Sequence, residues 1–233
     1  MKSITIVQYN CGNSNYRATR PLFDSLDPEE HQIIAIQEPA FNKQTRKTYQ
    51  PNGYHLLYEP DPATRTCFLI SKHINTQAWS YRSISPNIAK LQIATERGQI
   101  SIINVYNPSD NRPQITTWGV LQQTIDTAEG EIIILGDFNT HHTAWGGPQA
   151  TEEAQATHLL NELATRDIVL TTLTGEPTWK RGTQESTIDL TFMQEALADR
   201  LEFCGPEDTW ALTADHIPIR IALDIAVLAP RTH

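Results

Sequence analysis

The sequence lacks the features that define several large classes of protein. It contains no run of about 18 apolar residues, and its most apolar stretch, residues 217–228, is interrupted by Arg220 and Asp224, so we expect no membrane span. The first residues have neither the apolar run nor the small-residue cleavage site of a signal peptide. The three cysteines are scattered and odd in number, which argues against a disulfide framework and against a zinc cluster. These absences predict a protein of a reducing compartment, either the cytoplasm or the nucleus.

Positive charge is also scarce. The chain has 18 lysines and arginines against 27 aspartates and glutamates, which gives a formal net charge of −9 at pH 7. Proteins that hold nucleic acid through a broad electrostatic face are usually basic. We therefore expect this chain either to avoid polyanions or to bind them through local groups and metal ions, and composition alone leaves both alternatives open.

Several motifs of nucleotide binding and covalent catalysis are missing as well. There is no P-loop and no G-x-G-x-x-G, so nucleotide binding through either kind of loop has no support. There is no G-x-S-x-G elbow and no cysteine placed beside a base, so the sequence offers no credible nucleophile of its own.

The remaining composition describes one soluble domain. With 233 residues, of which 39% are hydrophobic and 19% charged, the chain fits a single globular domain over residues 1–233. No internal repeat and no Gly/Ser linker divides it. Short β-rich runs separated by polar turns predict strands at 4–9, 33–37, 54–58, 66–71, 74–80, 88–95, 99–106, 132–135, 168–171, 187–193, 201–203 and 217–225.

Helices are expected in three places. A short one is expected around residues 20–26, a second over 116–127 and a third over 151–166. Thr151 would cap the third helix, with two glutamates at the positive end of its dipole. Many strands with few helices fit an α/β or α+β sandwich of two packed sheets with helices on the outside.

The most informative passage joins a buried strand to a polar end. Four apolar residues, 132–135, are followed by Gly136, Asp137, Phe138 and Asn139. Residues two apart in an extended chain point the same way, so Asp137 and Asn139 can address one site while Phe138 points into the core. An ordinary turn is the alternative, because Asp and Asn favour turns.

The same pattern recurs along the chain. Polar side chains end or border other expected strands at Asn10, Glu38, Tyr106, Asp189, Asp215 and His216. Sheets commonly collect active sites at their strand ends, so the recurrence favours one site over several unrelated turns. Carboxylates, carboxamides, a phenol and a histidine form a hard-oxygen site suited to Mg²⁺ or Mn²⁺. The chemistry that fits best is attack of metal-assisted water on a phosphate ester.

Two adjacent histidines suggest a different metal. His141 and His142 would suit zinc, but neighbours in an extended chain point apart, and no HExxH motif or cysteine pair supports them. We therefore interpret His142 as a candidate phosphate contact or supporting group rather than as a metal ligand.

Six motifs, in order along the chain, resemble those of the endonuclease/exonuclease/phosphatase superfamily, which includes apurinic endonucleases and DNase I-like nucleases. They are Tyr-Asn-Cys-Gly at 9–12, Gln37-Glu38, Asn104-Val-Tyr106, Gly136-Asp-Phe-Asn139, Ser186-Thr-Ile-Asp189 and Asp215-His216. The motifs span essentially the whole chain. The resemblance implies the fold of that superfamily, a four-layered α/β sandwich of two packed, mainly antiparallel sheets flanked by helices.

Within the superfamily, four passages are similar to the endonuclease domain of non-LTR retrotransposons. They are Gln-Glu-Pro at 37–39, Arg65-Thr-Cys-Phe, residues 136–146 and Thr178-Trp179. In such elements the domain precedes a reverse transcriptase on a long polyprotein, so this chain resembles an excised domain. The resemblance implies an endonuclease that acts in the nucleus, uses Mg²⁺ (with Mn²⁺ as a substitute) and nicks one strand of double-stranded DNA. The 3′-hydroxyl left at the nick would prime reverse transcription.

The resemblance also implies a metal site. Glu38 would be the main metal carboxylate, with Asn10 nearby and Asp215 in the same site. Two departures from the family pattern lie in this region. Gly12 stands where the repair enzymes carry an acidic residue, and Ala214 replaces the serine of a Ser-Asp-His motif, which removes one supporting hydrogen bond and predicts modest activity.

Other roles implied by the resemblance concern the phosphate and the water. Asp137 and Asn139 would orient the attacking water and the phosphate, and Tyr106 would contact the phosphate. His216 would bind or protonate phosphate oxygens, and Asp189 would hold its imidazole in the correct tautomer.

A hairpin is expected beside these residues. Residues 180–185 contain a glycine and lie between two strand-like flanks, which predicts a β-hairpin. Lys180 and Arg181 would place positive charge at its tip and bind DNA, whereas an ordinary solvated turn is the alternative. The resemblance favours a hairpin that probes the minor groove and so selects the sites that are nicked.

Two other functions remain open on the sequence. One is a repair-type apurinic endonuclease or a phosphatase of the same superfamily, which nicking of undamaged plasmid would distinguish. The other is a catalytically inactive module that binds DNA or protein. The intact acidic and histidine set disfavours this second alternative, because buried unpaired carboxylates cost stability unless they serve a function.

Overall fold

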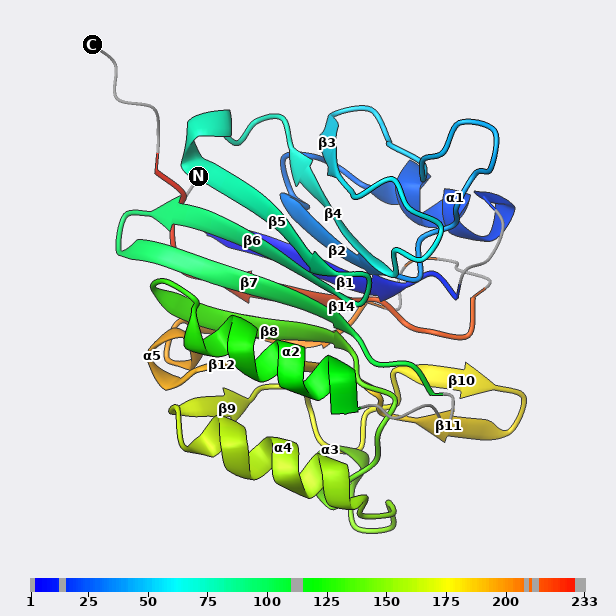
Figure 1. Ribbon diagram of the computed structural model, residues 1–233, viewed down its shortest axis with the longest axis vertical. Coiled ribbons are helices and arrows are strands. Elements are labelled where there is room, and N and C mark those ends of the chain that lie inside the picture. The colour runs from blue at the N-terminus through cyan, green and yellow to red at the C-terminus, as the bar shows by residue number, and fades with distance from the viewer. Residues whose placement is uncertain (1–2, 13–15, 110–114, 208–209, 211–213, 229–233) are drawn as a thin grey trace.

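Two six-stranded sheets pack face to face in the computed structural model, which describes residues 3–12, 16–109, 115–207, 210 and 214–228 (Figure 1). The first sheet contains, in spatial order, β13 (Leu201–Pro206), β14 (Ile219–Leu223), β1 (Ile4–Asn10), β2 (Ile33–Gln37), β4 (Thr66–Ser71) and β3 (Tyr54–Leu57). The second contains β5 (Trp79–Ser85), β6 (Ile88–Thr95), β7 (Gly98–Tyr106), β8 (Glu131–Asp137), β12 (Asp189–Gln194) and β9 (Ile168–Leu170). A separate hairpin is formed by β10 (Trp179–Arg181) and β11 (Gln184–Ser186).

Helices form the two outer layers. The helices are α1 (Tyr16–Ser25), α2 (Ile115–Asp126), α3 (Thr143–Gly146), α4 (Ala154–Ala164) and α5 (Glu195–Ala198). Residues of α1 pack on the outer face of the first sheet, and residues of α2 and α4 pack on the outer face of the second. The expected four-layered α/β sandwich is therefore confirmed. No helix among the described residues is long and apolar enough to cross a membrane.

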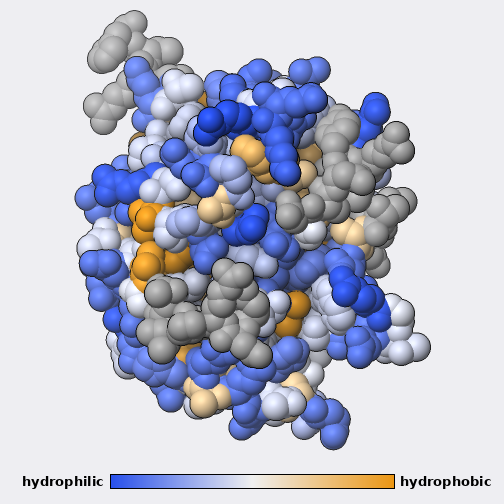
Figure 2. Space-filling model, turned by 45° about the vertical axis from the view of Figure 1, so that its right-hand side comes forward, coloured by the Kyte–Doolittle hydropathy of each residue, from blue (hydrophilic) through white to orange (hydrophobic). Residues whose placement is uncertain are grey.

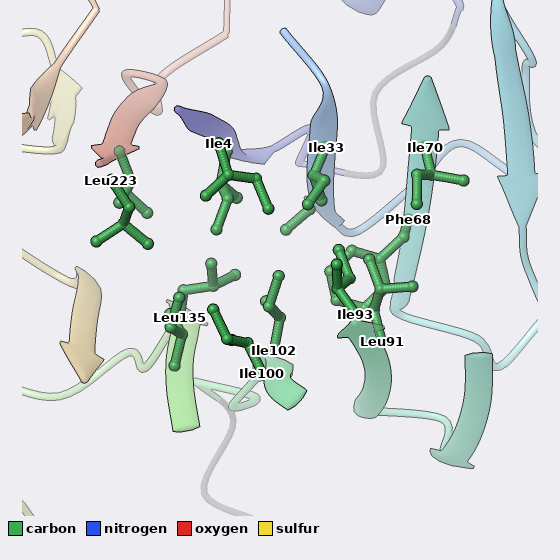
Figure 3. Packing of buried hydrophobic residues seen from close by; sticks show 14 of the residues in the cluster. Ile4, Ile33, Phe68, Ile70, Leu91, Ile93, Ile100, Ile102, Leu135 and Leu223 are labelled. Carbon is green, nitrogen blue, oxygen red and sulfur yellow. The ribbon is translucent and has the colours of Figure 1, made fainter. Parts of the chain in front are cut away.

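The main core lies between the sheets. Figure 3 shows side chains of the first sheet, such as Ile33 and Phe68, facing Leu91 and Ile102 of the second. Alternate residues of each strand point to opposite faces, so Ile103 packs under the helices instead. This burial on both faces explains the nearly continuous apolar runs of the central strands. Each such side chain stabilises the fold by roughly 1.5–3 kcal/mol relative to an exposed position.

Two parallel pairs within the mainly antiparallel sheets bring polar strand ends together. β1 and β2 are parallel, with Asn10 opposite Gln37, and β7 and β8 are parallel, with Tyr106 opposite Asp137. β12 runs antiparallel to β8 and places Asp189 directly opposite Asp137. The polar strand ends named by the sequence therefore meet at one end of the sandwich.

The expected strand at 74–80 is wrong in its first half. Residues 76–78 form a turn of 3₁₀ helix, and β5 begins only at Trp79. Asn75 Oδ1 accepts a hydrogen bond from Gln77 N at 2.9 Å, and this local bond competes with an extended backbone.

The expected cap of α4 is also wrong. The helix begins at Ala154 rather than near Thr151, and its N-cap is Glu153, whose side chain makes no cap hydrogen bond. The Glu153 carboxylate instead accepts a hydrogen bond from Thr140 Oγ1 at 2.6 Å. This acidic residue therefore holds the loop that follows Asn139, and the helix starts where that loop ends.

Gly136 allows β7 and β8 to approach each other beside Asp137. Its φ is +145°, and a β-carbon at this position would lie 1.9 Å from the Val105 carbonyl oxygen. We expect Gly136→Ala to lower the free energy of unfolding by about 3 kcal/mol or more, because backbone atoms must move to admit the methyl group. The measurement is urea unfolding of both proteins.

Gly119 in α2 provides the matched control. It is exposed, and nothing lies within 4 Å of the β-carbon that alanine would add. Gly119→Ala should therefore raise the free energy of unfolding by roughly 0.5–1 kcal/mol, the usual gain in helix propensity. Equal unfolding midpoints for Gly136→Ala and the wild type would contradict the tight approach of the two strands.

Candidate active site

Backbone hydrogen bonds join the polar strand ends of both sheets into one continuous edge. The bonds are Glu38 N to Arg65 O (2.8 Å), Arg65 N to Pro86 O (2.7 Å), Tyr106 N to Asn87 O (2.9 Å) and Asn107 N to Asp137 O (2.8 Å). Glu38, Tyr106 and Asp137 are therefore fixed relative to one another by the main chain. This edge lies on the right in Figure 1, and Figure 2, which turns that side forward, shows a mainly hydrophilic surface there.

Asp137 lies at the centre of the site and is buried. Its Oδ2 accepts hydrogen bonds from Asn10 Nδ2 at 2.7 Å and from Asn139 Nδ2 at 3.0 Å, and its Oδ1 accepts one from Asn139 N at 2.9 Å. Asn139 adopts the left-handed conformation, with φ +44°, and also donates to Asn107 O at 2.7 Å. Three donors directed at one carboxyl group favour its ionised form.

Asp189 and His216 form a buried pair next to Asp137. Asp189 Oδ2 lies 2.8 Å from His216 Nδ1, so the proton at Nδ1 is held by the carboxylate and Nε2 is left for a ligand. Burial alone would lower the pKa of His216, but the Asp189 carboxylate outweighs it and raises the pKa to about 9. Thr178 Oγ1 accepts hydrogen bonds from Ile188 N at 3.1 Å and from Asp189 N at 2.9 Å, which fixes the backbone at this pair.

The two carboxylates of this cluster, beside His216, fit a cation. Ligand atoms of Asp137, Asp189 and His216 all lie within 4.8 Å of one another. Burial, followed by the neighbouring Asp189 carboxylate, raises the pKa of Asp137, and Asp189 Oδ1 is buried without a hydrogen-bond partner in the described structure. A divalent cation would relieve both the repulsion and the unpaired oxygen. The hard oxygen donors suit Mg²⁺ or Mn²⁺.

Glu38 reaches the site from the first sheet. In a regular strand it would share the outer face with Ile36, but its φ of +47° interrupts the alternation. Its carboxylate accepts a hydrogen bond from the Tyr106 hydroxyl, and burial together with this carboxylate raises the pKa of Tyr106 far above its ordinary value. Tyr106 therefore remains a neutral hydrogen-bond donor.

Asp215 is held by the hairpin. Its Oδ2 lies 2.6 Å from Arg181 Nη2, and its carbonyl oxygen accepts a hydrogen bond from Lys180 N at 2.7 Å. The metal-compatible cluster of described residues contains neither Asp215 nor Glu38. Their assignment as metal ligands, together with Asn10, stays a prediction. For Asn10 the structure shows a competing bond, because its Oδ1 accepts from Gly12 N at 2.7 Å.

The expected hairpin at 180–185 is confirmed, but the position of its charges is corrected. Lys180 and Arg181 lie in β10 rather than at the tip, which Gly182 occupies with φ +62°. Their charges are also matched, because Arg181 pairs with Asp215 and Lys180 Nζ lies 3.8 Å from a Glu185 carboxylate oxygen. The hairpin thus offers less free positive charge to DNA than the sequence suggested.

His142 caps the short helix α3. Its Nδ1 accepts a hydrogen bond from Ala144 N at 3.0 Å, which requires the tautomer with the proton on Nε2. That Nε2–H remains available as a donor, so the predicted phosphate contact is compatible with the geometry. His141 turns instead to Glu153, with Nδ1 3.3 Å from Oε1.

A set of buried hydrogen bonds behind the site, which we call the clamp, was given no role from the sequence. Asn104 Oδ1 accepts from Gln37 Nε2 at 2.6 Å, and Asn104 Nδ2 donates to Ile36 O at 3.0 Å and Cys67 O at 2.9 Å. The clamp therefore ties β7 to β2 and β4 across the core. The available signal was the presence of Gln37 and Asn104 inside otherwise apolar runs.

Comparisons with known proteins identify the family from a sequence profile and the fold from solved structures. A sequence profile of the endonuclease-reverse transcriptase family matches residues 100–220, just over half of the chain. A comparison with curated proteins gave no match.

Several solved structures share the fold. The endonuclease domain of TRAS1, a telomere-specific non-LTR retrotransposon, superposes with a TM-score of 0.77 at 17% identity, over 95% of this chain and 98% of that chain. The catalytic domain of Xenopus laevis APE2 gives 0.77 at 17% identity, over 98% and 94%. An AP endonuclease from Archaeoglobus fulgidus gives 0.67 at 15% identity, over 95% and 99%. These structures establish a DNase I-like α/β sandwich.

The Asp189–His216 pair generates a prediction about protonation. We expect Asp189→Asn to lower the pKa of His216 from about 9 towards or below its ordinary value, because burial then outweighs the remaining carboxylates. NMR titration of the His216 imidazole measures this. In the wild type the folded pKa exceeds the unfolded value of about 6.5, so the pair stabilises the fold below pH 6.5 and this stability is lost as pH rises to about 9.

Asp126→Asn is the control, because it breaks the exposed ion pair between Asp126 and Arg166. It should leave the His216 titration unchanged. An unaltered His216 pKa in Asp189→Asn would show that the carboxylate does not set it.

Proposed function

The chain belongs to the endonuclease-reverse transcriptase family, and from this premise we propose that it nicks one strand of double-stranded DNA in a reaction that requires Mg²⁺ or Mn²⁺. The nick leaves a 3′-hydroxyl that primes reverse transcription. One observation carries the proposal: Asp137, Asp189 and His216 converge at the strand ends of both sheets, beside Asn10 and Asn139. This set matches the needs of phosphodiester hydrolysis, which are a cation site, a group to orient water and a proton donor.

Different residues of this chain serve different parts of the proposed reaction. A bound Mg²⁺ would polarise the phosphate and stabilise charge on the leaving oxygen. Glu38 is the proposed main carboxylate for the ion, with Asn10 and Asp215 at its margin. Asp137, held by Asn139, accepts a hydrogen bond from the attacking water and aligns it with the phosphorus.

Two donors act on the phosphate itself. His216 is protonated at neutral pH because Asp189 raises its pKa, so its Nε2–H donates to a phosphate oxygen and stabilises the charge that develops there. The Tyr106 phenol supplies a second donor. His142 Nε2–H is a further candidate donor to a phosphate.

Double-stranded DNA is the proposed substrate. Among the structural neighbours, a 3′ phosphatase from Neisseria is described in complex with a product DNA hairpin, and the TRAS1 domain is named as an endonuclease. Residues 1–233 would then be one domain of a longer polyprotein that also carries a reverse transcriptase, and its site of action would be the nucleus.

A repair-type apurinic endonuclease is the second candidate. It is favoured by the likeness to Xenopus laevis APE2, which equals that to TRAS1 in TM-score. Gly12 weighs against it, because the repair enzymes carry an acidic residue at that position. A β-carbon at residue 12 would lie 3.8 Å from Asp215 Oδ1, so this chain lacks a carboxylate that the repair enzymes would place there. Nicking of undamaged supercoiled plasmid supports the first candidate, and cutting confined to abasic sites supports the second.

Glu38→Gln tests the proposed metal carboxylate. The substitution keeps the shape of the side chain and removes its charge, so we expect nicking of supercoiled plasmid in Mg²⁺ to fall by at least about 10²-fold while the fold survives. The wild type should be inactive with EDTA. Glu96→Gln, at an exposed position in the turn between β6 and β7, should nick at the wild-type rate. Normal nicking by a well-folded Glu38→Gln protein would refute the assignment.

Replacement of residues 180–185 by a short glycine-containing turn tests the hairpin. A groove probe reads the width and deformability of DNA, so we expect metal-dependent nicking to persist while the map of nicked positions changes. Arg181→Ala is the control for loss of the ion pair with Asp215 alone. Sequencing of the nicked ends gives the maps, and identical maps would make the hairpin an ordinary turn.

A further inference from the structure

The segment between Glu38 and β3 is basic, in contrast to the rest of the chain. From residue 39 to residue 58 there is no aspartate or glutamate, whereas Lys43, Arg46 and Lys47 occur in one turn. All three side chains are exposed. In a protein of formal net charge −9, such a segment is a local point of attraction for a polyanion.

The turn that carries these cations is fixed by its own hydrogen bonds. Asn42 Oδ1 accepts from Gln44 N at 2.9 Å and from Thr45 N at 3.1 Å, and Asn42 O accepts from Arg46 N at 2.8 Å. Asn42 N donates to Lys47 O at 2.9 Å, which closes the turn. Because the backbone is already ordered, a ligand that binds the cations needs to restrict only their side chains.

Aromatic residues of the segment lie against α1. Phe41 and Tyr49 line a hollow of about 520 Å³ together with Phe23 of α1, and the rings of Phe23 and Tyr49 lie 5.1 Å apart. The segment therefore packs against α1 through Tyr49. Lys43, Arg46 and Lys47 remain exposed, and Lys47 also lines this hollow.

The three cations are electrostatically free. Within the part of the chain that the structure describes, none of them forms an ion pair with a carboxylate, in contrast to Lys180 and Arg181 of the hairpin. Their charge is thus available to phosphates, and no internal ion pair has to be broken first.

The position of the turn limits where it can contact DNA. Lys43 is five residues from Glu38, which allows at most about 18 Å between their Cα atoms. At 3.4 Å per base pair, this distance corresponds to about five base pairs of duplex. In Figure 1 the segment between β2 and β3 lies above the ends of β1 and β2, whereas the β10–β11 hairpin projects below them. The turn and the hairpin therefore flank the site.

We infer that residues 42–47 form a basic turn that binds backbone phosphates of duplex DNA within about five base pairs of the cleaved bond, on the side opposite the β10–β11 hairpin. This inference rests on the proposed function, since it places the substrate of the same site. Contacts to phosphates carry no sequence information, so the basic turn positions the DNA and does not choose where it is nicked.

The first test is equilibrium binding of an undamaged duplex in EDTA, measured by fluorescence anisotropy over a range of NaCl concentrations. Each phosphate contact contributes about 0.9 to the slope of log K against log [salt]. A triple variant should therefore show a slope reduced by about 2 to 3 and weaker binding; its substitutions are Lys43→Ala, Arg46→Ala and Lys47→Ala. In nicking assays this variant should raise KM and leave kcat within about twofold, because the contacts are made equally in the ground and transition states.

The matched control removes three other exposed cations. Lys72, Arg82 and Arg97 are all exposed. Lys72 follows β4 and Arg97 precedes β7, in each case at the end of the strand away from the site. Lys72→Ala, Arg82→Ala and Arg97→Ala combined change the net charge equally, and the salt slope should stay at the wild-type value. Lys43→Arg with Lys47→Arg keeps the charge and should also preserve the slope, which separates loss of charge from disruption of the turn.

Shortened duplexes test the location. On one side of the cut, removing the base pairs within five positions should abolish the difference in salt slope between the wild type and the variant that lacks the three cations of the turn. Shortening the duplex on the other side should leave that difference unchanged. If the wild type binds duplex DNA but the slopes of the two triple variants are equal, the basic turn is refuted and the endonuclease function stands. A wild type that neither binds nor nicks duplex DNA would overturn both.

Discussion

Asp137 joins the two sheets, because its buried carboxylate at the end of β8 accepts a hydrogen bond from Asn10 at the end of β1. The same carboxylate orients Asn139, and its strand neighbour across the ladder is Asp189. Leaving a buried polar group without its hydrogen-bond partner typically costs about 1–3 kcal/mol, and more for a charged group, so the Asp137 carboxylate depends on its amide donors. The site is therefore a constraint on the fold as well as a product of it: the sandwich must close at this end for the carboxylate to be satisfied.

Backbone strain at the site follows from the same constraint. Glu38 and Asn139 both have positive φ, which is uncommon for residues other than glycine and costs of order 1–3 kcal/mol each. Both follow a buried strand, and for Glu38 the regular alternation of that strand would direct the side chain to the outer face with Ile36. The strain is held by neighbouring bonds, such as Glu38 N to Arg65 O at 2.8 Å. The strain lowers the stability of the fold, and in return side chains from the two sheets converge on one site. Such an arrangement is typical of functional sites.

The sequence predicted the sheets, the outer helices and the identity of the polar strand ends, because buried strands and repeated polar termini leave local patterns. It did not predict the 3₁₀ turn before Trp79, since one side-chain bond from Asn75 decided between helix and strand. Nor did it predict that Glu153 would bond to Thr140, or that Arg181 would pair with Asp215. Those contacts join residues 13 and 34 positions apart, and they arise from tertiary packing, which periodicity does not encode.

The distribution of charge bears on the proposed action of this acidic chain on a polyanion. The hairpin cations beside the site are matched internally, so the attraction cannot come from them alone. At the site itself two buried carboxylates would repel a phosphate, unless a cation and the protonated His216 reverse the local sign. On the proposed function, local positive charge at the site and on the basic turn would determine where DNA is held, and the negative remainder of the surface would repel it. The net charge of −9 would then favour a single orientation of a bound duplex over non-specific binding.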